Sequence, residues 1–213
     1  MKTALIAGYT GLVGRELLNL LLASDQYEKI IAIGRRKLGI EHNKLTEVVI
    51  DFDNMVINDH VDDVFCCLGT TMKKAGSREK FRMIDFQYPL NLAIVGKNNG
   101  AKTFVLISAN GANVHSFFFY NRVKGELEAA IDRLAFTCYE IVRPSLLLGD
   151  RSETRFGEDI GKLFMRVFGF LFIGPLKNVK GIKASSVARA MIYLANDGSS
   201  GKRVHNSAVL QRY

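Results

Sequence analysis

Tyr120 and Lys124 are the residues whose types and spacing best suit proton transfer. They are four positions apart at the start of a predicted helix, so their side chains lie on the same helical face. A phenol has a pKa of about 10 and is a poor acid or base at neutral pH. A neighbouring ammonium group stabilises the phenolate and lowers that pKa. The phenol can then give a proton to a carbonyl oxygen, or remove one from an alcohol.

The helix that carries this pair is predicted from one apolar stripe. Its members follow the i, i+4, i+7, i+8 and i+11 spacing: Val123, Leu127, Ala130, Ile131 and Leu134. A Tyr-x-x-x-Lys pair arises easily by chance, so its position in the chain has to give it meaning. It occurs once here, soon after a predicted strand, Thr103–Ile107, and a loop that begins with Ser108. This order favours a functional pair.

A glycine-rich turn follows the first predicted strand, residues 3–7. It reads Gly8-Tyr9-Thr10-Gly11-Leu12-Val13-Gly14, and residues 15–22 continue at helical spacing. Glycines let the chain reverse tightly, let a pyrophosphate approach the bare backbone and let the helix pack on the strand. The helix start then offers free N–H groups to phosphates. The turn predicts a dinucleotide site, although its G-x-x-G-x-x-G spacing only approximates the usual fingerprint. A glycine turn without a ligand is the alternative.

Two arginines, Arg35 and Arg36, end the second predicted strand, residues 29–34. An NAD-binding unit usually has a carboxylate near this point, where it holds the ribose 2′-hydroxyl. A guanidinium group instead binds a 2′-phosphate through a planar, two-point contact. The arginines therefore predict NADP(H) as the cofactor. A pair of exposed arginines at a strand end is the alternative.

Two further loops follow predicted strands at residues 46–50 and 61–67, where an open α/β sheet binds its ligands. In the first loop, Asp51 could accept a hydrogen bond from an adenine amino group while Phe52 covers the ring. The second loop is Leu68-Gly69-Thr70-Thr71, in which Gly69 would let the backbone pass close to the cofactor. Ordinary turn chemistry is the alternative for both loops.

Composition narrows the class of protein and its partners. The 213 residues, with 48% hydrophobic content, suit a single domain over residues 1–213. The net charge of +8 fits an anionic cofactor or substrate. Without a recognition motif we expect no nucleic-acid partner. The three cysteines have no metal-ligand spacing, so we expect no metal site, and their odd number fits a reducing compartment, by default the cytoplasm.

These motifs together resemble the short-chain dehydrogenase/reductases of the atypical kind. Within them the chain is most similar to the Tat-interacting-protein oxidoreductase group and its small bacterial relatives. The likeness runs through about the first 150 residues and rests on the glycine turn, the paired arginines, Asp51-Phe52, Leu68-Gly69-Thr70-Thr71, Tyr120-x-x-x-Lys124-Gly125-Glu126 and Arg143-Pro144. It implies a Rossmann-like domain, NADP(H), Tyr120 as general acid/base, Lys124 as its helper, and Pro144 beside the nicotinamide.

The resemblance also implies a catalytic serine after the fifth strand, and here the chain departs from the pattern. The family serine is often the second or third residue of that loop, where this chain has Ala109 and Asn110. Ser108 is then the candidate catalytic serine. Its hydroxyl could instead point into the sheet, which would leave Asn110 to hold a substrate carbonyl.

We therefore expect an α/β fold, a doubly wound and mostly parallel sheet with helices on both faces. Residues 144–183 would form substrate-side loops and a helix. The basic, Phe-rich segment 161–186 favours core packing, with a substrate pocket, a homodimer contact or a peripheral membrane contact as alternatives. The expected function is an NADP(H)-dependent oxidoreductase for a small carbonyl or alcohol substrate. An NADPH-binding sensor with little catalysis is the alternative.

Overall fold

A computed structural model describes residues 1–148 and 181–213 of the chain. Within them, parallel pairing joins seven strands into one sheet in the order β3-β2-β1-β4-β5-β6-β9. The strands are β1 (Lys2–Ala7), β2 (Tyr27–Gly34), β3 (Leu45–Val49), β4 (Asp63–Cys66), β5 (Thr103–Ile107), β6 (Cys138–Arg143) and β9 (Gly201–Asn206). The strand order reverses direction between β1 and β4, as in a doubly wound sheet, and this confirms the predicted fold class.

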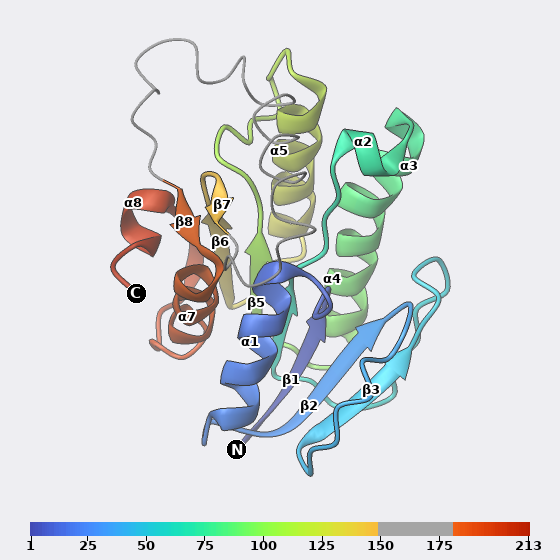
Figure 1. The fold of residues 1–213 in the computed structure, drawn as a ribbon, viewed down its shortest axis with the longest axis vertical. Helices are drawn as coiled ribbons and strands as arrows, with labels where there is room; N and C mark the ends of the chain where they lie inside the picture. The colour runs from blue at the N-terminus through green and yellow to red at the C-terminus, as the bar shows by residue number, and fades with distance from the viewer. Residues whose placement is uncertain (149–180) are drawn as a thin grey trace.

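Helices cover both faces of the sheet (Figure 1). One face packs against α1 (Leu12–Ala23) and α7 (Ala184–Leu194), and the other against α4 (Tyr88–Asn98) and α5 (Phe119–Asp132). Side chains along a strand point alternately to the two faces. On β1, for example, Ile6 belongs to the core under α1, while Leu5 belongs to the core under α4 and α5. Because both faces are covered, the central strands read as continuous apolar runs.

The helical segment that begins at Arg78 is continuous but includes a change from α- to π-helical turns. It runs from α3 (Arg78–Arg82) through a π-helical turn, η1 (Met83–Gln87), into α4. Pro89 has no N–H to donate to the carbonyl of Asp85, the bond an α-helix would require there. The wider turn that precedes Pro89 absorbs this loss.

The remaining elements are short. The short α2 (Met72–Ala75) precedes α3, and α8 (Ser207–Leu210) follows β9. A small parallel pair, β7 (Leu147–Leu148) and β8 (Ile182–Lys183), flanks residues 149–180. Most of the predicted substrate-side segment 144–183, with the phenylalanines of 161–186, lies outside the described residues. In the part that is described, none of the helices combines the length and hydropathy needed to cross a membrane.

Candidate active site

The glycine turn after β1 is shaped by close backbone contacts. Gly8 has a φ of 84°, and a Cβ there would collide with the carbonyl oxygen of Cys67 at the end of β4. A Cβ on Gly14 would collide with the carbonyl of Gly8, so α1 can pack on the turn only because that residue is glycine. Gly11 is the N-cap of α1 and offers no side-chain hydrogen bond to the first helical N–H groups. These groups remain for a phosphate, so the turn fits a dinucleotide.

The side chains between the glycines of the turn differ in how deeply they are buried. Tyr9 is fully buried and Val13 is 5% exposed, so their side chains belong to the core, whereas Leu12 is 47% exposed. Tyr9 and Val13 can therefore face a cofactor only through their backbone. The Tyr9 hydroxyl donates to the carbonyl of Arg36 at 3.0 Å, which links the glycine turn to the arginine pair.

Both arginines are exposed directly after β2. The nearby carboxylate of Glu47 accepts hydrogen bonds from the backbone N–H groups of Leu38 and Gly39 at 2.7 and 2.8 Å. Burial opposes ionisation, but these donors hold the pKa of Glu47 below its usual value. Glu47 is thus engaged in shaping the loop, and Arg35 and Arg36, followed by Lys37, are exposed charged groups at the strand end.

The loop after β3 has an exposed acid and a buried ring. Asp51 accepts hydrogen bonds from the side chain of Asn54 and the backbone N–H of Asp53, and these donors lower its pKa. Phe52 is 6% exposed, and its ring stacks on Tyr88 with 5.3 Å between the ring centres. The structure therefore gives Phe52 a core contact, and its cover of an adenine ring stays a prediction.

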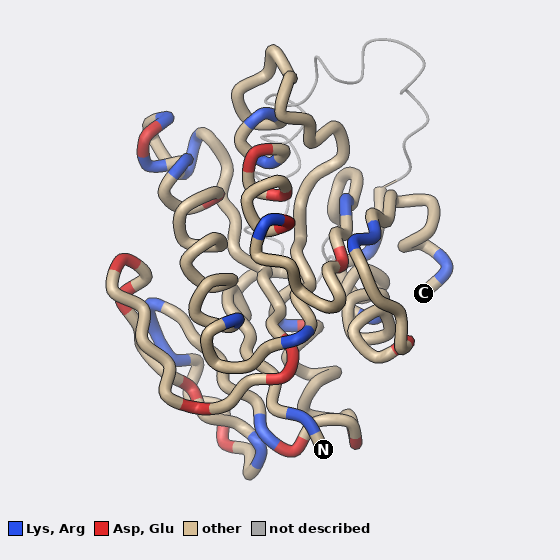
Figure 2. Tube along the Cα trace, turned by 180° about the vertical axis from the view of Figure 1, so that it is seen from behind, with Lys and Arg blue, Asp and Glu red and all other residues tan. Residues whose placement is uncertain are grey.

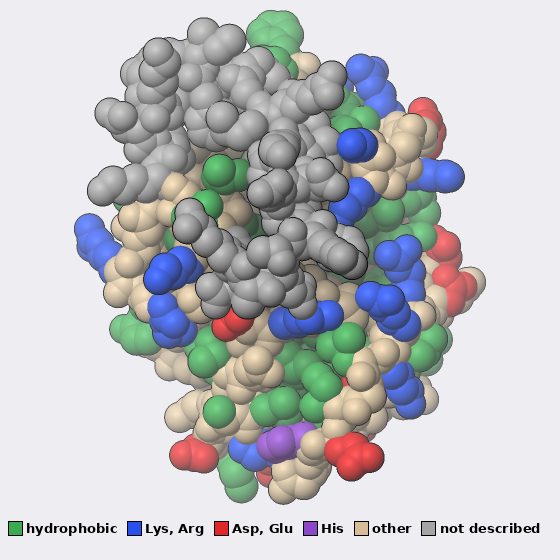
Figure 3. All heavy atoms as spheres, viewed as in Figure 1, with side chains coloured by type: hydrophobic (Ala, Val, Ile, Leu, Met, Phe, Trp, Pro, Cys, Tyr) green, Lys and Arg blue, Asp and Glu red, His purple; other side chains and the backbone are tan. Residues whose placement is uncertain are grey.

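The loop after β4 touches the predicted catalytic helix. Thr71 caps α2 by accepting from the N–H of Lys74, and the Thr70 N–H donates to Asp85 Oδ2 at 2.8 Å. At Gly69, an added Cβ would lie 3.5 Å from Asp85 Oδ1 and 3.8 Å from the nitrogen of Lys124. The predicted cofactor loop and Lys124 therefore meet, and Asp85 joins them. Basic side chains gather around α2 and α3 on this side of the molecule (Figure 3).

Lys124 and Asp85 form a buried ion pair. Their charged atoms are 2.8 Å apart, and the two side chains are 4% and 1% exposed. Burial alone would lower the pKa of Lys124, but the Asp85 carboxylate outweighs it and the pKa is raised. Burial raises the pKa of Asp85, and Lys124 opposes that shift. The 2.8 Å contact is that of an ammonium–carboxylate pair.

Tyr120 lies half-buried beside this pair, with its ring 5.4 Å from that of Phe81. Burial raises the pKa of its phenol, Lys124 opposes the shift and Asp85 adds to it. We expected the Lys124 ammonium group to bring this pKa down. In the protein alone the pKa of Tyr120 is raised, because burial outweighs the ammonium charge of Lys124 and the Asp85 carboxylate adds to the rise.

Ser108 is directed away from these groups. It is 5% exposed, and its hydroxyl donates to Glu128 of α5 at 2.5 Å. Glu128 also binds Arg143 through two hydrogen bonds of 2.9 and 2.5 Å. Asn110 is exposed, and its N–H donates to the carbonyl of the buried Pro144 at 3.4 Å. The geometry matches the expected alternative in which the serine hydroxyl points inward.

Sequence reasoning missed Asp85 and Glu128. Asp85 was not among the predicted site residues, although it is a lone acid in the apolar run Met83-Ile84-Asp85-Phe86. An acid at such a position needs a buried partner. This requirement could have indicated a buried ion pair from the sequence, but it does not identify the cation that pairs with Asp85.

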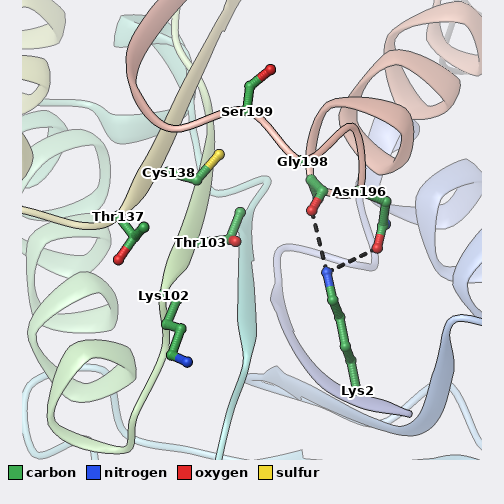
Figure 4. A pocket seen from close by; sticks show the side chains of 9 residues that line it. Lys2, Lys102, Thr103, Thr137, Cys138, Asn196, Gly198 and Ser199 are labelled. Atoms are coloured by element: carbon green, nitrogen blue, oxygen red, sulfur yellow. Dashed lines mark hydrogen bonds between the residues drawn. The ribbon is translucent and has the colours of Figure 1, made fainter.

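A different cavity, of about 200 Å³, opens at the other end of the sheet (Figure 4). It lies at the amino-terminal ends of β1, β5 and β6. Lys2 reaches into it and donates to Asn196 Oδ1 at 2.9 Å, and it pairs with Asp63 at 3.0 Å. Open α/β sheets bind ligands at the carboxyl ends of their strands, so this cavity is separate from the candidate site.

The strand order and the glycine turn at its reversal point define a class of protein, the Rossmann-type dinucleotide-binding proteins of the short-chain dehydrogenase/reductase kind. Comparison narrows the class. Residues 4–113, more than half of the chain, match the NAD dependent epimerase/dehydratase family. The chain belongs to that family, as an atypical short-chain dehydrogenase/reductase of the HTATIP2 group.

Individual relatives support this placement. Protein HTATIP2 of Rattus norvegicus is 37% identical over an alignment of 221 residues, and the match covers 98% of this chain and 88% of the relative. A Candida glabrata protein named "Protein FMP52, mitochondrial" is 36% identical over an alignment of 200 residues. The match covers 86% of this chain and 85% of the relative. The mitochondrial names of the yeast relatives contradict the predicted cytoplasmic location. That prediction is wrong because free cysteines indicate a reducing environment without indicating which compartment provides it.

Solved structures agree on the fold. A short-chain dehydrogenase family protein from Francisella tularensis superposes with a TM-score of 0.69 at 15% identity, with 98% of both chains covered. The Bordetella bronchiseptica enzyme WbmH, solved in complex with NAD+, gives a TM-score of 0.68 at 16% identity, with 96% of this chain and 75% of that chain covered. At such low identity these likenesses support the architecture alone.

Proposed function

We propose that the protein is an NADP(H)-dependent oxidoreductase that acts on a small carbonyl or alcohol. The observation that carries the proposal is that the loop of Gly69, Lys124 and Tyr120 come together at one edge of the sheet. The loop of Gly69 lies against Lys124, and Tyr120 precedes Lys124 by one helical turn. The family description supports a nicotinamide dinucleotide as the cofactor, which would supply or accept hydride when bound.

The choice of NADP(H) over NAD(H) rests on the end of β2. Arg35 and Arg36 are exposed there, and Glu47 is held by backbone amides rather than turned to a ribose. A guanidinium group suits a 2′-phosphate, and a carboxylate would repel it. Among the described residues, no carboxylate forms an ion pair with either arginine.

Tyr120 and Lys124 divide the acid–base work. The Tyr120 hydroxyl donates its proton to the substrate oxygen as the carbonyl carbon is reduced, and it takes the proton back in the reverse reaction. Lys124 stabilises the phenolate that remains and can hydrogen-bond the ribose hydroxyls. No step is assigned to Ser108, because its hydroxyl donates to Glu128.

Fluorescence titration of the purified protein with NADPH and NADH tests the cofactor. We expect the wild type to prefer NADPH, and we expect the Arg35→Ala/Arg36→Ala variant to lose about ten- to a hundredfold of that affinity, the loss expected for one charged hydrogen bond. Lys37→Ala is the matched control, since it removes an adjacent exposed cation. If neither nucleotide binds the wild type, the proposed function is wrong.

A second candidate function, a nucleotide-binding sensor with little catalysis, is favoured by the inward orientation of Ser108. A screen of small carbonyls and alcohols with NADP(H) separates the two candidates. Turnover that Tyr120→Phe lowers by about a hundredfold or more supports the oxidoreductase. NADPH binding without turnover of any substrate class supports the sensor.

A further inference from the structure

Asp85 joins two parts of the candidate site that are far apart in sequence. One carboxylate oxygen pairs with Lys124 of α5 at 2.8 Å, and the other accepts from the Thr70 N–H of the loop after β4 at 2.8 Å. Asp85 itself comes from η1, the π-helical turn that precedes Pro89. Single π-helical turns inside α-helices often mark functional positions, because they change the direction of a side chain.

Burial of this pair carries a cost that packing alone does not explain. Asp85 and Lys124 lie almost entirely out of solvent, and each charge loses its hydration there. Apolar residues of similar size would usually give equal or greater stability at such a position. The pair also lies next to Tyr120, whose ionisation both of its charges affect. Its position therefore points to a role in the site.

We propose that Asp85 is a positioning residue that balances the charge of Lys124 and so keeps Tyr120 a neutral proton donor in the resting site. This inference rests on the proposed function, because Tyr120 is the acid of that reaction. The inference adds to that function the direction in which the reaction is favoured. A resting site that holds a neutral phenol is prepared to protonate a carbonyl, the step that reduction requires.

The proton balance is simple. The hydride for the new C–H bond at the carbonyl carbon would come from NADPH, which would be oxidised to NADP+ when bound. The O–H bond of Tyr120 breaks and its proton passes to the carbonyl oxygen. The phenolate that remains faces the Lys124 ammonium group and recovers a proton from water. Asp85 takes no proton in this cycle, since it acts only through the position and charge of Lys124.

The titratable groups that face Lys124 from the described elements can be named. They are Asp85 from η1, Tyr120 from its own helix and Cys66 from the end of β4. Burial raises the pKa of the Cys66 thiol to about 12, so Cys66 is neutral at physiological pH. Among the residues that the structure describes, Asp85 is therefore the charged group that balances Lys124, and its loss removes that balance beside Tyr120.

A spectrophotometric titration of Tyr120 tests the inference without cofactor or substrate. Phenolate absorbance is recorded from about pH 7 to 12 for the wild type and for Asp85→Asn, and the same curve of a Tyr120→Phe partner is subtracted. The subtraction removes the other tyrosines among the 7 in the chain. We expect the Tyr120 midpoint to fall by about one to three pH units in Asp85→Asn. Asp132→Asn, at the far end of α5, is the control and should leave it unchanged.

Two further measurements test whether the effect acts through Lys124 and whether Asp85 is ionised. In Asp85→Asn/Lys124→Met, which removes both charges, the Tyr120 midpoint should rise again, since the effect acts through Lys124. This variant leaves no unpaired buried charge, so it should fold even if Asp85→Asn does not. In the wild type, carbon NMR of the Asp85 carboxyl should show an ionised group at neutral pH.

Each contrary result overturns the inference. These are an unchanged or higher midpoint in Asp85→Asn, an equally low midpoint in the double variant, or a protonated Asp85 in the wild type. The proposed function is judged separately by NADPH titration. If NADPH binds and Tyr120 does not respond to Asp85→Asn, the inference is wrong and the function stands. If Tyr120 responds but no nucleotide binds, the function is wrong while the charge balance stands.

Discussion

Helix α5 carries two buried ion pairs one helical turn apart, and they are built differently. Lys124 meets Asp85 through one contact of 2.8 Å, and both side chains are almost completely buried. Glu128 meets Arg143 through two hydrogen bonds, and the arginine side chain is 27% exposed. Charged positions of both signs follow one another along this helix (Figure 2).

The partners of the two carboxylates show what each pair does. Glu128 also accepts from Ser108, so it ties α5 to the ends of β5 and β6. Asp85 also accepts from Thr70, which belongs to a predicted cofactor loop. A pair whose neighbours are strand ends fixes the position of a helix. A pair shared with a binding loop can respond to what that loop holds.

The largest effect on stability should come from Asp85→Ala. This variant leaves the Lys124 ammonium group buried without a partner, so we expect the free energy of unfolding to fall by about 3–5 kcal/mol. Urea denaturation measures it. In Asp85→Ala/Lys124→Met most of the loss should be recovered, and an undiminished loss would contradict the ion-pair explanation.

Glu128→Ala should cost less, about 2–3 kcal/mol, because the partly exposed Arg143 can turn to water. The same urea experiment gives the value. NADPH affinity should stay close to that of the wild type, in contrast to variants of the Asp85 pair. A Glu128→Ala protein that folds normally but loses nucleotide binding would remove the distinction between the two pairs.

Ser108→Ala removes a single hydrogen bond to a charged acceptor and should cost about 1.5–3 kcal/mol at most. If the serine serves only the Glu128 pair, turnover and its pH profile remain unchanged. Asn110→Ala is the comparison, since it tests the exposed residue that could hold a substrate carbonyl. Loss of turnover in Ser108→Ala, with normal stability, would restore a catalytic serine.

The smallest effect should come from Glu126→Ala. Glu126 lies on the same helix, but both side chains of its ion pair with Arg82 reach solvent, with the arginine 47% and the glutamate 31% exposed. Such pairs contribute about 0–1 kcal/mol and are weakened by salt. Denaturation at low and high ionic strength checks both points. A loss as large as that of Glu128→Ala would show that burial does not separate these pairs.

Much of the fold follows from local sequence patterns. Buried apolar runs followed by turn residues predicted the strands, and the stripe from Val123 to Leu134 predicted α5. The last strand, β9, completes the sheet by pairing with β6. These signals are local because the side-chain period of a strand or a helix can be read within one segment.

The candidate site was predictable only in part. The Tyr-x-x-x-Lys spacing placed Tyr120 and Lys124 on one face of a helix, but spacing gives no information about partners from other segments. Asp85 and Glu128 are missing from the expectation because their cations come from distant elements. The direction of the Ser108 hydroxyl depends on Glu128 and was equally out of reach. Long-range contacts therefore decide the charge state of a site whose residue types are visible in the sequence.

The contact between Gly8 and Cys67 has a consequence for how the protein is made. The glycine turn is complete within the first fourteen residues, but its shape is fixed against the end of β4, where the Cys67 N–H also donates to the Ala7 carbonyl at 2.8 Å. Contacts between distant segments form late, because closing a long loop costs entropy. A nascent chain released before β4 has emerged from the ribosome would contain every residue of the turn but lack its geometry. The turn therefore reaches its binding geometry only after the chain has been made as far as Cys67.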